Sequence, residues 1–264
     1  KISARKLAKE CGVPINEGSG ALGDFAEVEA RAEEIGYPVL IKASAGGGGR
    51  GMRVVSEPKG LKSAFYMASS EAQTAFGDPT LFVERYIQNA RHVEVQVLGD
   101  NFGRVVHLGE RDCSSQRRHQ KVVEEASPFG LPDKLTKGMS AAAVALAKGV
   151  NYNSAGTVEF LVDMDRHQFY FMEVNTRIQV EHPVTEMVTG ADIVREQILI
   201  AAGEKLDPGL GRAPQGHAIE CRIYAEDPDA DFQPCPGFLT EVILPGGPGV
   251  RVDSALVSRS AVPP

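Results

Sequence analysis

The pattern of apolar and polar positions divides the chain into a helix-rich first part and a longer strand-rich part. Residues 92–97 alternate strictly between polar and apolar side chains, which is typical of a strand with one buried face. The turn at 100–103 then predicts a hairpin whose second strand covers 104–108. Further strands are predicted at 39–41, 52–55, 81–87, 157–162, 168–174 and 217–225.

Capping residues mark where the helices begin and end. Ser3 is placed to cap a short helix that ends at Gly12. Asp24 followed by Glu27 forms a capping box for a second helix, which stops at Gly36. Further helices are predicted at 57–74, at 141–148 and, capped by Thr185, at 185–202.

Two unlike modules follow from this pattern. Residues 13–87 form a small α+β unit, and residues 88–264 form a larger unit dominated by antiparallel strands. Within the larger unit, residues 205–214 are the best candidate for a linker. The predicted fold class is therefore α+β.

Composition and charge limit the partners of the protein. The chain of 264 residues is 42% hydrophobic and carries a net charge of −7. A negative surface disfavours nucleic acid and acidic membranes, so a phosphate ligand needs a local group of basic residues. No apolar run approaches the ~18 residues that a membrane span requires. We also expect no secretory signal. We therefore expect no contact with nucleic acid and no membrane span.

The four cysteines indicate the redox environment of the protein, and the two ends of the chain indicate that it belongs to a longer protein. Cys11, Cys113, Cys221 and Cys235 include no pair with the two-residue spacing of a zinc or redox motif. They are interpreted as thiols in a reducing cytosol. The chain starts directly at residue 1 without Met and stops on two prolines just after a strand-like stretch, so we expect both ends to belong to a longer protein.

A glycine-rich turn at 45–51 lies between two predicted strands. It lacks the Gly-Lys-Ser/Thr ending of a P-loop, and no helix follows at once, so it is neither a Walker loop nor a Rossmann turn. Glycine backbone can approach phosphate oxygens closely and offer N–H donors to them. Lys42, just before the turn, is placed to neutralise phosphate charge. The alternative interpretation is a flexible hairpin without a ligand.

Two glutamates interrupt otherwise apolar strands. Glu159 lies in the strand 157–162 and Glu173 in the strand 168–174, and the hairpin between these strands brings the two carboxylates together. Like charges at close range favour a cation between them, and Mg²⁺ prefers a few carboxylates together with nucleotide phosphates. Asn175 shares the face of Glu173 and can add an oxygen ligand. The alternative is a pair of edge-strand glutamates that face water.

Basic side chains gather in two further segments. Residues 111–121 are dense in hydrogen-bond donors, although such a run can also be a solvated face. After Asn175, the residues Arg177, Gln179 and Glu181 alternate along an extended segment and are expected to share one side. An arginine fork suits a small planar oxyanion such as bicarbonate, and a nearby carboxylate can take its proton. The alternative is an ordinary surface ion pair.

Taken together, these segments resemble the biotin carboxylases, which include subunits or domains of acetyl-CoA, propionyl-CoA, methylcrotonyl-CoA, pyruvate and urea carboxylases. The resemblance runs nearly end to end and is most specific over 116–125 and 175–186. The segments that carry it are Lys42 with the glycine-rich turn, 81–87, 91–94, 110–114, 116–125, 156–160, 173–186 and 220–222.

The resemblance implies a fold and a set of site residues. The implied fold is ATP-grasp, with a linker helix (1–15), a lid subdomain (16–87), a large subdomain (88–204) and the start of an incomplete C-terminal region (215–264). The implied ATP contacts are Lys1, Lys42, Gly47, Gly48, Gly49, Glu84, Ile87, His92, Gln116, His119, Glu159, Leu161 and Glu173. The implied metal ligands are Glu159, Glu173 and Asn175, and the implied bicarbonate site is Lys121, Arg177, Gln179 and Val180. Glu181 resembles the base that deprotonates bicarbonate, and Arg222 resembles the residue that stabilises the biotin enolate, so that the implied catalytic set is Glu181, Arg177, Lys121 and Arg222.

The implied reaction uses ATP, Mg²⁺ or Mn²⁺ and bicarbonate to carboxylate biotin through carboxyphosphate, beneath a lid that closes over the nucleotide. Biotin is expected on a separate biotin carboxyl carrier protein or domain, and the final acceptor is chosen by a separate carboxyltransferase. The full-length protein is expected to form a homodimer in the cytoplasm, or in the mitochondrion or plastid of a eukaryote.

Two departures and two competing interpretations accompany the resemblance. Residues 255–260 lack the aromatic and glycine residues that are usual in the family. The resemblance also implies an α/β domain before Lys1 and further strands and helices after Pro264, which we expect to be absent from these 264 residues. We therefore expect nucleotide binding at best from the 264 residues alone.

One competing interpretation is another ATP-grasp ligase, such as half of a carbamoyl-phosphate synthetase, although the Arg-Gln-Glu alternation and Arg222 favour biotin carboxylase. The other is a nucleotide-binding or assembly module without catalysis.

Overall fold

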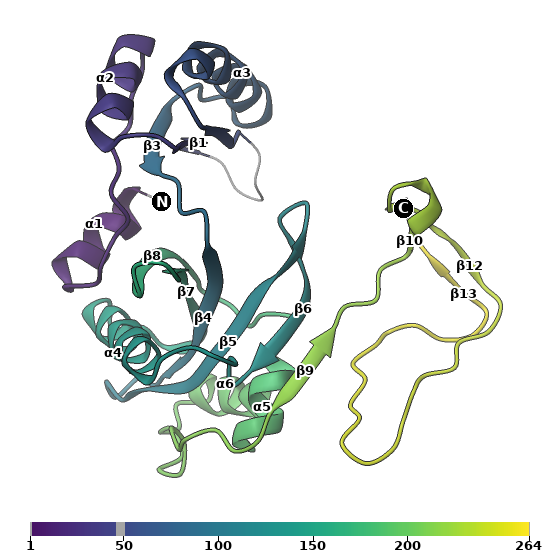
Figure 1. Ribbon diagram of the computed structural model, residues 1–264. Coiled ribbons are helices and arrows are strands. Elements are labelled where there is room, and N and C mark those ends of the chain that lie inside the picture. Colours follow the sequence, from purple (N-terminus) through teal and green to yellow (C-terminus); the bar gives the residue numbers. More distant parts are fainter. Residues whose placement is uncertain (1, 46–50, 264) are drawn as a thin grey trace. The chain divides into compact units, whose positions relative to one another are not determined.

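The computed structural model describes residues 2–45 and 51–263. The chain divides into two compact units, Lys1–Cys221 and Arg222–Pro264, and each is described by itself. The first unit holds a three-stranded sheet and a six-stranded sheet, while the second holds short strand pairs (Figure 1). None of the described helices combines the length and the apolar character that crossing a bilayer requires.

The first unit begins with a helix and a small layered subdomain, which contains the segment predicted as the lid and is called the lid below. Helix α1 (Ile2–Glu10) precedes α2 (Phe25–Ile35), and the small sheet has the order β2-β1-β3 with antiparallel pairs. Its strands are β1 (Val39–Ala43), β2 (Arg53–Val55) and β3 (Leu81–Arg85), and α3 (Pro58–Phe76) connects β2 to β3. Figure 1 shows α2 and α3 grouped beside these strands.

Local signals in the sequence place the lid helices correctly. The Asp24 side chain accepts a hydrogen bond from the Glu27 N–H, which confirms Asp24 as the predicted cap, while the Glu27 carboxylate accepts its bond from the N–H of Gly23, one residue before the cap. The buried faces of α2 and α3 pack against the apolar side of β1 and β3, with Val28, Ile41, Leu61, Phe65 and Leu81 in one core. The opposite side of this small sheet carries polar residues of the candidate site.

The large sheet supplies the frame of the first unit. It is antiparallel throughout and has the strand order β8-β7-β4-β5-β6-β9. Its strands are β4 (Ala90–Gly99), β5 (Val105–Arg117), β6 (Gln120–Ala126), β7 (Ser154–Asp163), β8 (Gln168–Asn175) and β9 (Ala218–Cys221). The helices that cover it are α4 (Asp133–Gly149), α5 (His182–Thr189) and α6 (Ile193–Ala201).

The alternation in β4 and β7 separates an apolar face of the sheet from a mixed face. Val93 and Val95 in β4, with Phe160 in β7, pack against Met139 of α4 in the largest core. The residues between them point to the other side of the sheet, because successive side chains of a strand alternate. That other side is apolar at one end, where α6 packs, and polar at the opposite end. The polar end holds the candidate site.

Several predicted elements differ from those observed. The predicted helix 185–202 is two helices, because Gly190 takes a left-handed conformation (φ 71°) that ends α5 and the Asp192 side chain caps α6. Thr185 is therefore not a cap but a buried residue inside α5. Helix α4 begins at Asp133, eight residues before the predicted start at 141. The predicted first helix begins at Ile2 and so already contains Ser3.

The end of the first unit is held against the sheet. The segment predicted as a linker, 205–214, includes the buried Leu206, and the Arg104 guanidinium donates to the carbonyl oxygens of Leu206 and Asp207 at 2.9 and 2.8 Å. The predicted strand 217–225 is shorter, since β9 ends at Cys221 where the second unit starts. The second unit contains β10 (Glu226–Asp227), a 3-10 turn (Pro228–Ala230), β11 (Gln233–Pro234), β12 (Gly237–Leu239) and β13 (Ser260–Val262).

One glycine in the large sheet gives a test of this packing. A Cβ atom at Gly99 would lie 2.1 Å from the Tyr152 carbonyl oxygen, whereas one at Gly60, inside α3, would meet only the Val55 Cγ1 atom at 3.6 Å. We expect Gly99→Ala to lower the free energy of unfolding by roughly 1–3 kcal/mol. Gly60→Ala should instead raise it by about 0.5–1 kcal/mol, since alanine is the better helix former. Urea unfolding of both variants checks the pair, and equal effects would contradict the packing described.

Candidate functional site

A row of charged residues crosses the large sheet at its polar end. Arg111 of β5 lies opposite Glu94 of β4, Glu94 lies opposite Glu159 of β7, and Glu159 lies opposite Glu173 of β8. Directly opposite residues of antiparallel strands present their side chains on the same face. The register therefore brings Glu159 and Glu173 together, as the hairpin predicted, and adds Glu94 and Arg111 to them.

The ammonium group of Lys121 is the centre of this arrangement. Lys121 lies in β6, and its Nζ atom is 2.7 Å from Glu94 Oε2, 3.0 Å from Glu159 Oε1 and 2.7 Å from Glu181 Oε1. The Glu94 and Glu181 side chains are fully buried, and that of Lys121 is 13% exposed. One cation thus links carboxylates from β4, β7 and the residue that precedes α5.

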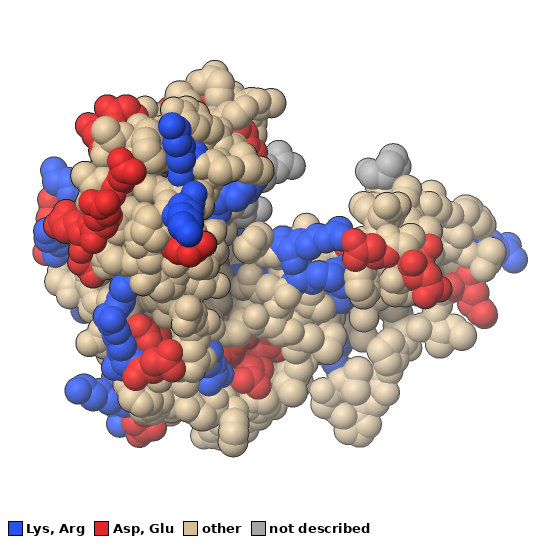
Figure 2. Space-filling view, turned by 45° about the horizontal axis from the view of Figure 1, so that its top comes forward, with Lys and Arg blue, Asp and Glu red and all other residues tan. Residues whose placement is uncertain are grey.

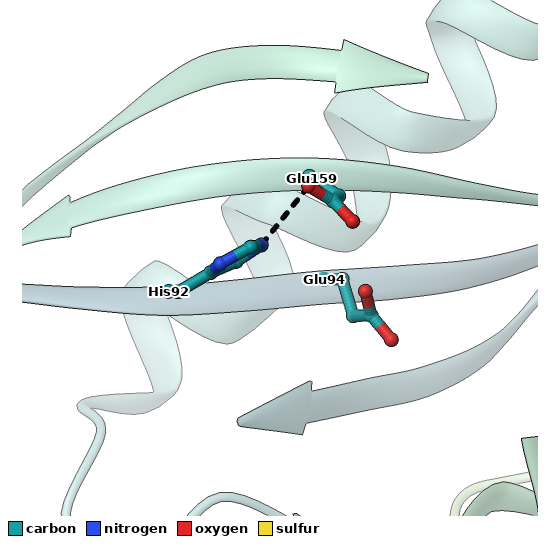
Figure 3. A group of neighbouring side chains, drawn as sticks. All are labelled: His92, Glu94 and Glu159. Atoms are coloured by element: carbon teal, nitrogen blue, oxygen red, sulfur yellow. Dashed lines mark ion pairs between the residues drawn. The ribbon is translucent and has the colours of Figure 1, made fainter. Parts of the chain in front are cut away.

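Further polar side chains surround Glu159. His92 Nε2 lies 3.1 Å from Glu159 Oε2, and Figure 3 shows His92, Glu94 and Glu159 converging from β4 and β7. The Asn175 side-chain amide donates to Glu159 Oε1 at 2.9 Å. Gln116 Nε2 lies 2.8 Å from the other ring nitrogen of His92. The structure therefore gathers His92, Gln116 and Asn175, all predicted from the sequence, around one carboxylate.

Electrostatics fix which groups of the cluster carry charge. Burial alone would raise the pKa of Glu94, but Arg111 and Lys121 outweigh burial and hold that pKa below its usual value. Burial is likewise outweighed at Glu159, where His92 and Lys121 lower the pKa to about 2. Burial would lower the pKa of Lys121, but the carboxylates around it, Glu94 above all, keep it raised. Lys121 therefore stays cationic at neutral pH and cannot act as a general base.

Cys113 is also excluded as a reactive group. Its side chain is fully buried in β5, and burial, helped by the charge of Glu94, raises the pKa of the thiol. The thiolate form, which is the nucleophile and metal ligand, is therefore not populated at neutral pH. Carboxylates, together with the imidazole of His92, are left as candidate proton acceptors of the cluster.

The polar side of the lid carries a second charged group. Glu84 of β3 is 4% exposed, and its carboxylate pairs with Lys42 Nζ at 2.7 Å and with the guanidinium of Arg5 from α1. Lys42 and Glu84 were both predicted as nucleotide contacts, whereas Arg5 was not. The carboxylate of Glu84 thus orients the lysine that the sequence assigns to phosphate.

The remaining predicted nucleotide contacts are spread over the first unit. Ile87 is buried just after β3, Leu161 is half-buried in β7, and His119 is exposed in the turn between β5 and β6 with φ at 66°. Lys1, Gly47, Gly48 and Gly49 lie outside the described residues. Their roles stay predictions.

The segment after β8 departs from its predicted geometry. Residues 176–181 form a turn that leads into α5, so Arg177, Gln179 and Glu181 do not alternate along an extended strand as expected. Arg177 is exposed and donates to the Ile178 carbonyl, while Gln179 is 8% exposed and Glu181 is fully buried. Val180 is 58% exposed. The turn still places an accessible guanidinium within a few residues of the buried Glu181 that pairs with Lys121.

The residues present fit a magnesium ion beside Glu159. Glu159 and Glu173 face each other across β7 and β8, and Asn175 lies against Glu159, so oxygen ligands of the kind that Mg²⁺ prefers are close together. Among the described residues, ligand atoms of His92, Glu94 and Glu159 also lie within 4.8 Å of one another. The set predicted as metal ligands was Glu159, Glu173 and Asn175, and it stays a prediction.

Sequence reasoning missed residues behind the site. Glu94, Gln96 and Arg111 are buried and take part in the cluster, but they were interpreted only as a strand pattern and as a basic run. The alternation of 92–97 could have indicated Glu94 and Gln96, because it places these polar side chains together on one face of the strand. In the structure that face is buried at both residues. Arg222, in contrast, was predicted and lies at the start of the second unit.

Comparison with protein families decides the relationship. Residues 1–208 match the family described as carbamoyl-phosphate synthase L chain, ATP binding domain, and residues 220–264 match the biotin carboxylase C-terminal domain. The chain belongs to the biotin carboxylase family. The second match separates it from the carbamoyl-phosphate synthetases, which were the competing ATP-grasp interpretation.

Biotin carboxylases of known sequence and structure agree with this assignment. The chain is 52% identical to biotin carboxylase from Nostoc sp. and 51% identical to biotin carboxylase 1 from Bacillus subtilis, in both cases over 266 residues. A biotin carboxylase–βγ-ATP complex from Campylobacter jejuni has 50% identity and a TM-score of 0.93, covering 98% of this chain and 58% of that one. The α+β ATP-grasp fold predicted from the sequence is confirmed.

The match covers this chain completely but its relatives only in part. The alignments with the Nostoc and Bacillus biotin carboxylases cover 100% of this chain and 59% of each relative. A biotin carboxylase domain of the Hydrogenobacter thermophilus 2-oxoglutarate carboxylase, solved with MgADP, ADP and bicarbonate, has a TM-score of 0.91 and 48% identity; the match covers 100% of this chain and 58% of that one. The chain thus spans about three fifths of the length of these biotin carboxylases.

Proposed function

We propose that the full-length protein uses ATP and bicarbonate to carboxylate biotin on a carrier protein or domain. The observation that carries the proposal is the contact of the Lys121 ammonium with Glu94, Glu159 and Glu181. It joins a proposed metal ligand and a proposed base to one fixed cation. The biotin carboxylase domain of the Hydrogenobacter thermophilus 2-oxoglutarate carboxylase was solved with MgADP and bicarbonate, and a site with these charges would bind the same ligands.

The proposed mechanism assigns one task to each group. Glu181, buried and oriented by Lys121, takes the proton of bicarbonate, and Arg177 binds the anion from the exposed side. A bicarbonate oxygen attacks the γ-phosphorus of ATP, ADP leaves, and carboxyphosphate forms. Mg²⁺, when bound at Glu159 and Glu173, supplies Lewis-acid stabilisation of the phosphate charge. Lys121 contributes fixed positive charge in a largely buried setting, where it acts more strongly than in water.

The second half of the proposed reaction transfers the carboxyl group. Carboxyphosphate breaks into CO₂ and phosphate, phosphate takes a proton from biotin, and the biotin enolate attacks CO₂. Arg222 is proposed to stabilise the enolate. Lys42, held by Glu84, and the glycine-rich turn are proposed to cover the nucleotide and to keep water from carboxyphosphate.

The partners and setting belong to the same proposal. A biotin carrier, a carboxyltransferase and a second copy of the full-length protein are the proposed partners. The relatives include bacterial and chloroplastic biotin carboxylases and one subunit of the pyruvate carboxylase from Methanothermobacter thermautotrophicus. We therefore propose a cytoplasmic or organellar carboxylase whose final acceptor is selected by the carboxyltransferase.

Phosphate release by the purified full-length protein tests the proposal. With ATP and Mg²⁺, we expect release to depend on bicarbonate and to rise when free biotin is added. The 264-residue chain alone is expected to bind nucleotide without biotin-dependent turnover. Release that ignores both bicarbonate and biotin would contradict the proposal, and release that needs bicarbonate but ignores biotin would favour another ATP-grasp ligase.

A further inference from the structure

Arg111 lies beneath the cluster and has no part in the mechanism proposed above. Its side chain is completely buried in β5. Its Nε atom donates to Glu94 Oε1 at 2.6 Å, and its Nη1 atom donates to Gln96 Oε1 at 2.8 Å and to Thr185 Oγ1 at 3.0 Å. Its Nη2 atom donates to Thr157 Oγ1 at 3.3 Å. One guanidinium therefore holds β4, β7 and α5 to β5.

The geometry of guanidinium makes these contacts interdependent. Its donors are fixed in one plane, so the group cannot move toward one acceptor without weakening its bonds to the others. An ammonium group at the same place could keep the ion pair with Glu94 but could not span all four acceptors. The position thus demands arginine for its shape as well as for its charge.

Through Glu94, Arg111 controls the place of Lys121. The two oxygens of the Glu94 carboxylate are shared between two cations, since Oε1 accepts from Arg111 and Oε2 accepts from Lys121. Glu94 is fully buried, so bulk solvent does not reach these oxygens. A shift of Arg111 therefore moves the carboxylate to which the Lys121 ammonium is bound.

Through Thr185, Arg111 also controls the place of Glu181. Glu181 precedes the first residue of α5, and Thr185 lies one helical turn further on and is buried. The apolar cluster under α5 is small and consists mainly of Ala126, Val184 and Val188. The polar contact with Arg111 is therefore a large part of what fixes the start of this helix over the sheet.

These contacts close a ring. It runs from Arg111 to Glu94, from Glu94 to Lys121, from Lys121 to Glu181, and back to Arg111 through Thr185 of α5. We infer that Arg111 is a positioning residue of the carboxylation site, which holds the proposed base Glu181 and the cation Lys121 at their contact distance. The inference rests on the proposed function and adds a residue to it.

The alternative is an arginine that supports only the fold. Such a residue would affect stability and every ligand alike. A positioning residue instead affects the chemical step more than nucleotide binding, because its contacts lead directly to Lys121 and Glu181 and reach the predicted nucleotide contact Glu159 only through Lys121. The split between turnover and nucleotide affinity therefore separates the two roles.

The test uses three variants of the full-length protein. Arg111→Lys keeps the charge but removes the fork, and Thr185→Val keeps the shape of the side chain but removes the oxygen that Arg111 binds. Thr189→Val is the matched control, because the Thr189 hydroxyl lies on the same helix and donates to the Thr185 carbonyl without reaching Arg111. Each variant is assayed for bicarbonate-dependent ATP hydrolysis and for the Kd of ADP.

We expect Arg111→Lys and Thr185→Val to lower the turnover of bicarbonate-dependent hydrolysis by about 10- to 100-fold, as for a misplacement of catalytic groups of about 1 Å. The Kd of ADP should stay within about twofold, and Thr189→Val should behave as the unmodified protein. Combining the two substitutions should lower turnover little further than Arg111→Lys alone, because both break the same contact.

The outcomes separate failure of the inference from failure of the proposed function. Unchanged turnover in both Arg111→Lys and Thr185→Val overturns the inference while the proposed function stands. An equal loss in Thr189→Val, or a parallel loss of ADP binding, assigns Arg111 to the fold alone and also overturns it. If the unmodified full-length protein shows no bicarbonate dependence, the proposed function itself fails.

Discussion

Replacing Glu181 by glutamine in the full-length protein is expected to lower bicarbonate-dependent ATP hydrolysis by roughly 10²–10⁴-fold, the range of a lost general base. The carboxylate is buried and lies 2.7 Å from the Lys121 ammonium, and a glutamine amide keeps its size but cannot accept a proton. Lys121 and Cys113 cannot replace it, since the pKa of the first is raised by its carboxylates and that of the second by burial.

The measurement is phosphate release at saturating ATP, with and without bicarbonate. Glu204→Gln is the control, because Glu204 is an exposed glutamate of the same unit just after α6. It should keep full activity, and both variants should bind ADP as the unmodified protein does. Unchanged bicarbonate-dependent turnover in Glu181→Gln would show that Glu181 is not the base, whereas no turnover in the unmodified protein would support the remaining alternative, a nucleotide-binding module without catalysis.

Part of the large sheet was predictable from the sequence. Residues 92–97, which alternate strictly, gave β4, and the otherwise apolar runs 157–162 and 168–174 gave the hairpin of β7 and β8 that pairs Glu159 with Glu173. Side chains two residues apart on a strand lie on the same face of the sheet. The same reasoning explains why Asn175 was found beside Glu159.

The centre of the cluster was less accessible to sequence reasoning. Lys121 and Arg111 both bind Glu94 from the hairpin of β5 and β6, and that hairpin contains register shifts between Asp112 and Ser115 and between Ser115 and Gln116. Such irregularities break the alternation and leave a run that resembles a solvated basic face. The roles of Lys121 came only from the resemblance to biotin carboxylases.

The helices show a similar limit. The apolar period continues across residues 185–202, so the sequence favoured one helix, whereas the left-handed Gly190 ends α5. That break turns the chain so that Thr185 reaches Arg111 while α6 packs on a separate part of the sheet. The break has its own local signal, since glycine favours the left-handed conformation that ends a helix and the Asp192 side chain caps the next one.

The distribution of charge on the surface does not reveal the position of the site. Figure 2 shows acidic and basic side chains interspersed on the viewed face. The charged row of the site is buried instead, with Glu94, Arg111 and Glu181 all inaccessible to solvent. Buried charges of this kind require partners, so each one points to another member of the cluster.

Replacing Lys121 by methionine is expected to have the largest effect on stability. The substitution keeps most of the side-chain length but leaves Glu94, Glu159 and Glu181 without the ammonium that contacts all three. Removing one partner of a buried ion pair lowers the free energy of unfolding by about 3–5 kcal/mol. Bicarbonate-dependent turnover of the full-length variant should also be lost, because Glu181 loses the cation that orients it.

The control is Lys137→Met, which removes an exposed lysine that lies 3.3 Å from Asp133 within one helix. It should change the free energy of unfolding by less than about 0.5 kcal/mol, as exposed pairs of this kind do. Urea unfolding of the full-length proteins at neutral pH measures both effects. A loss no larger than that of the control would show that Lys121 is not the main partner of the three carboxylates.

The dependence on pH gives the sharper version of this test. The pKa of Glu159 is lowered to about 2 in the folded protein, so this carboxylate stabilises the fold above its ordinary pKa, and that contribution is lost as the pH falls toward 2. In Lys121→Met the buried carboxylates lack the ammonium and take up protons at higher pH, which relieves their repulsion. The difference in unfolding free energy between the unmodified protein and the variant should therefore shrink as the pH is lowered from about 7 to about 4. A difference that stays constant over this range would mean that Lys121 acts by packing and not by charge, and the electrostatic account of the site would then be wrong.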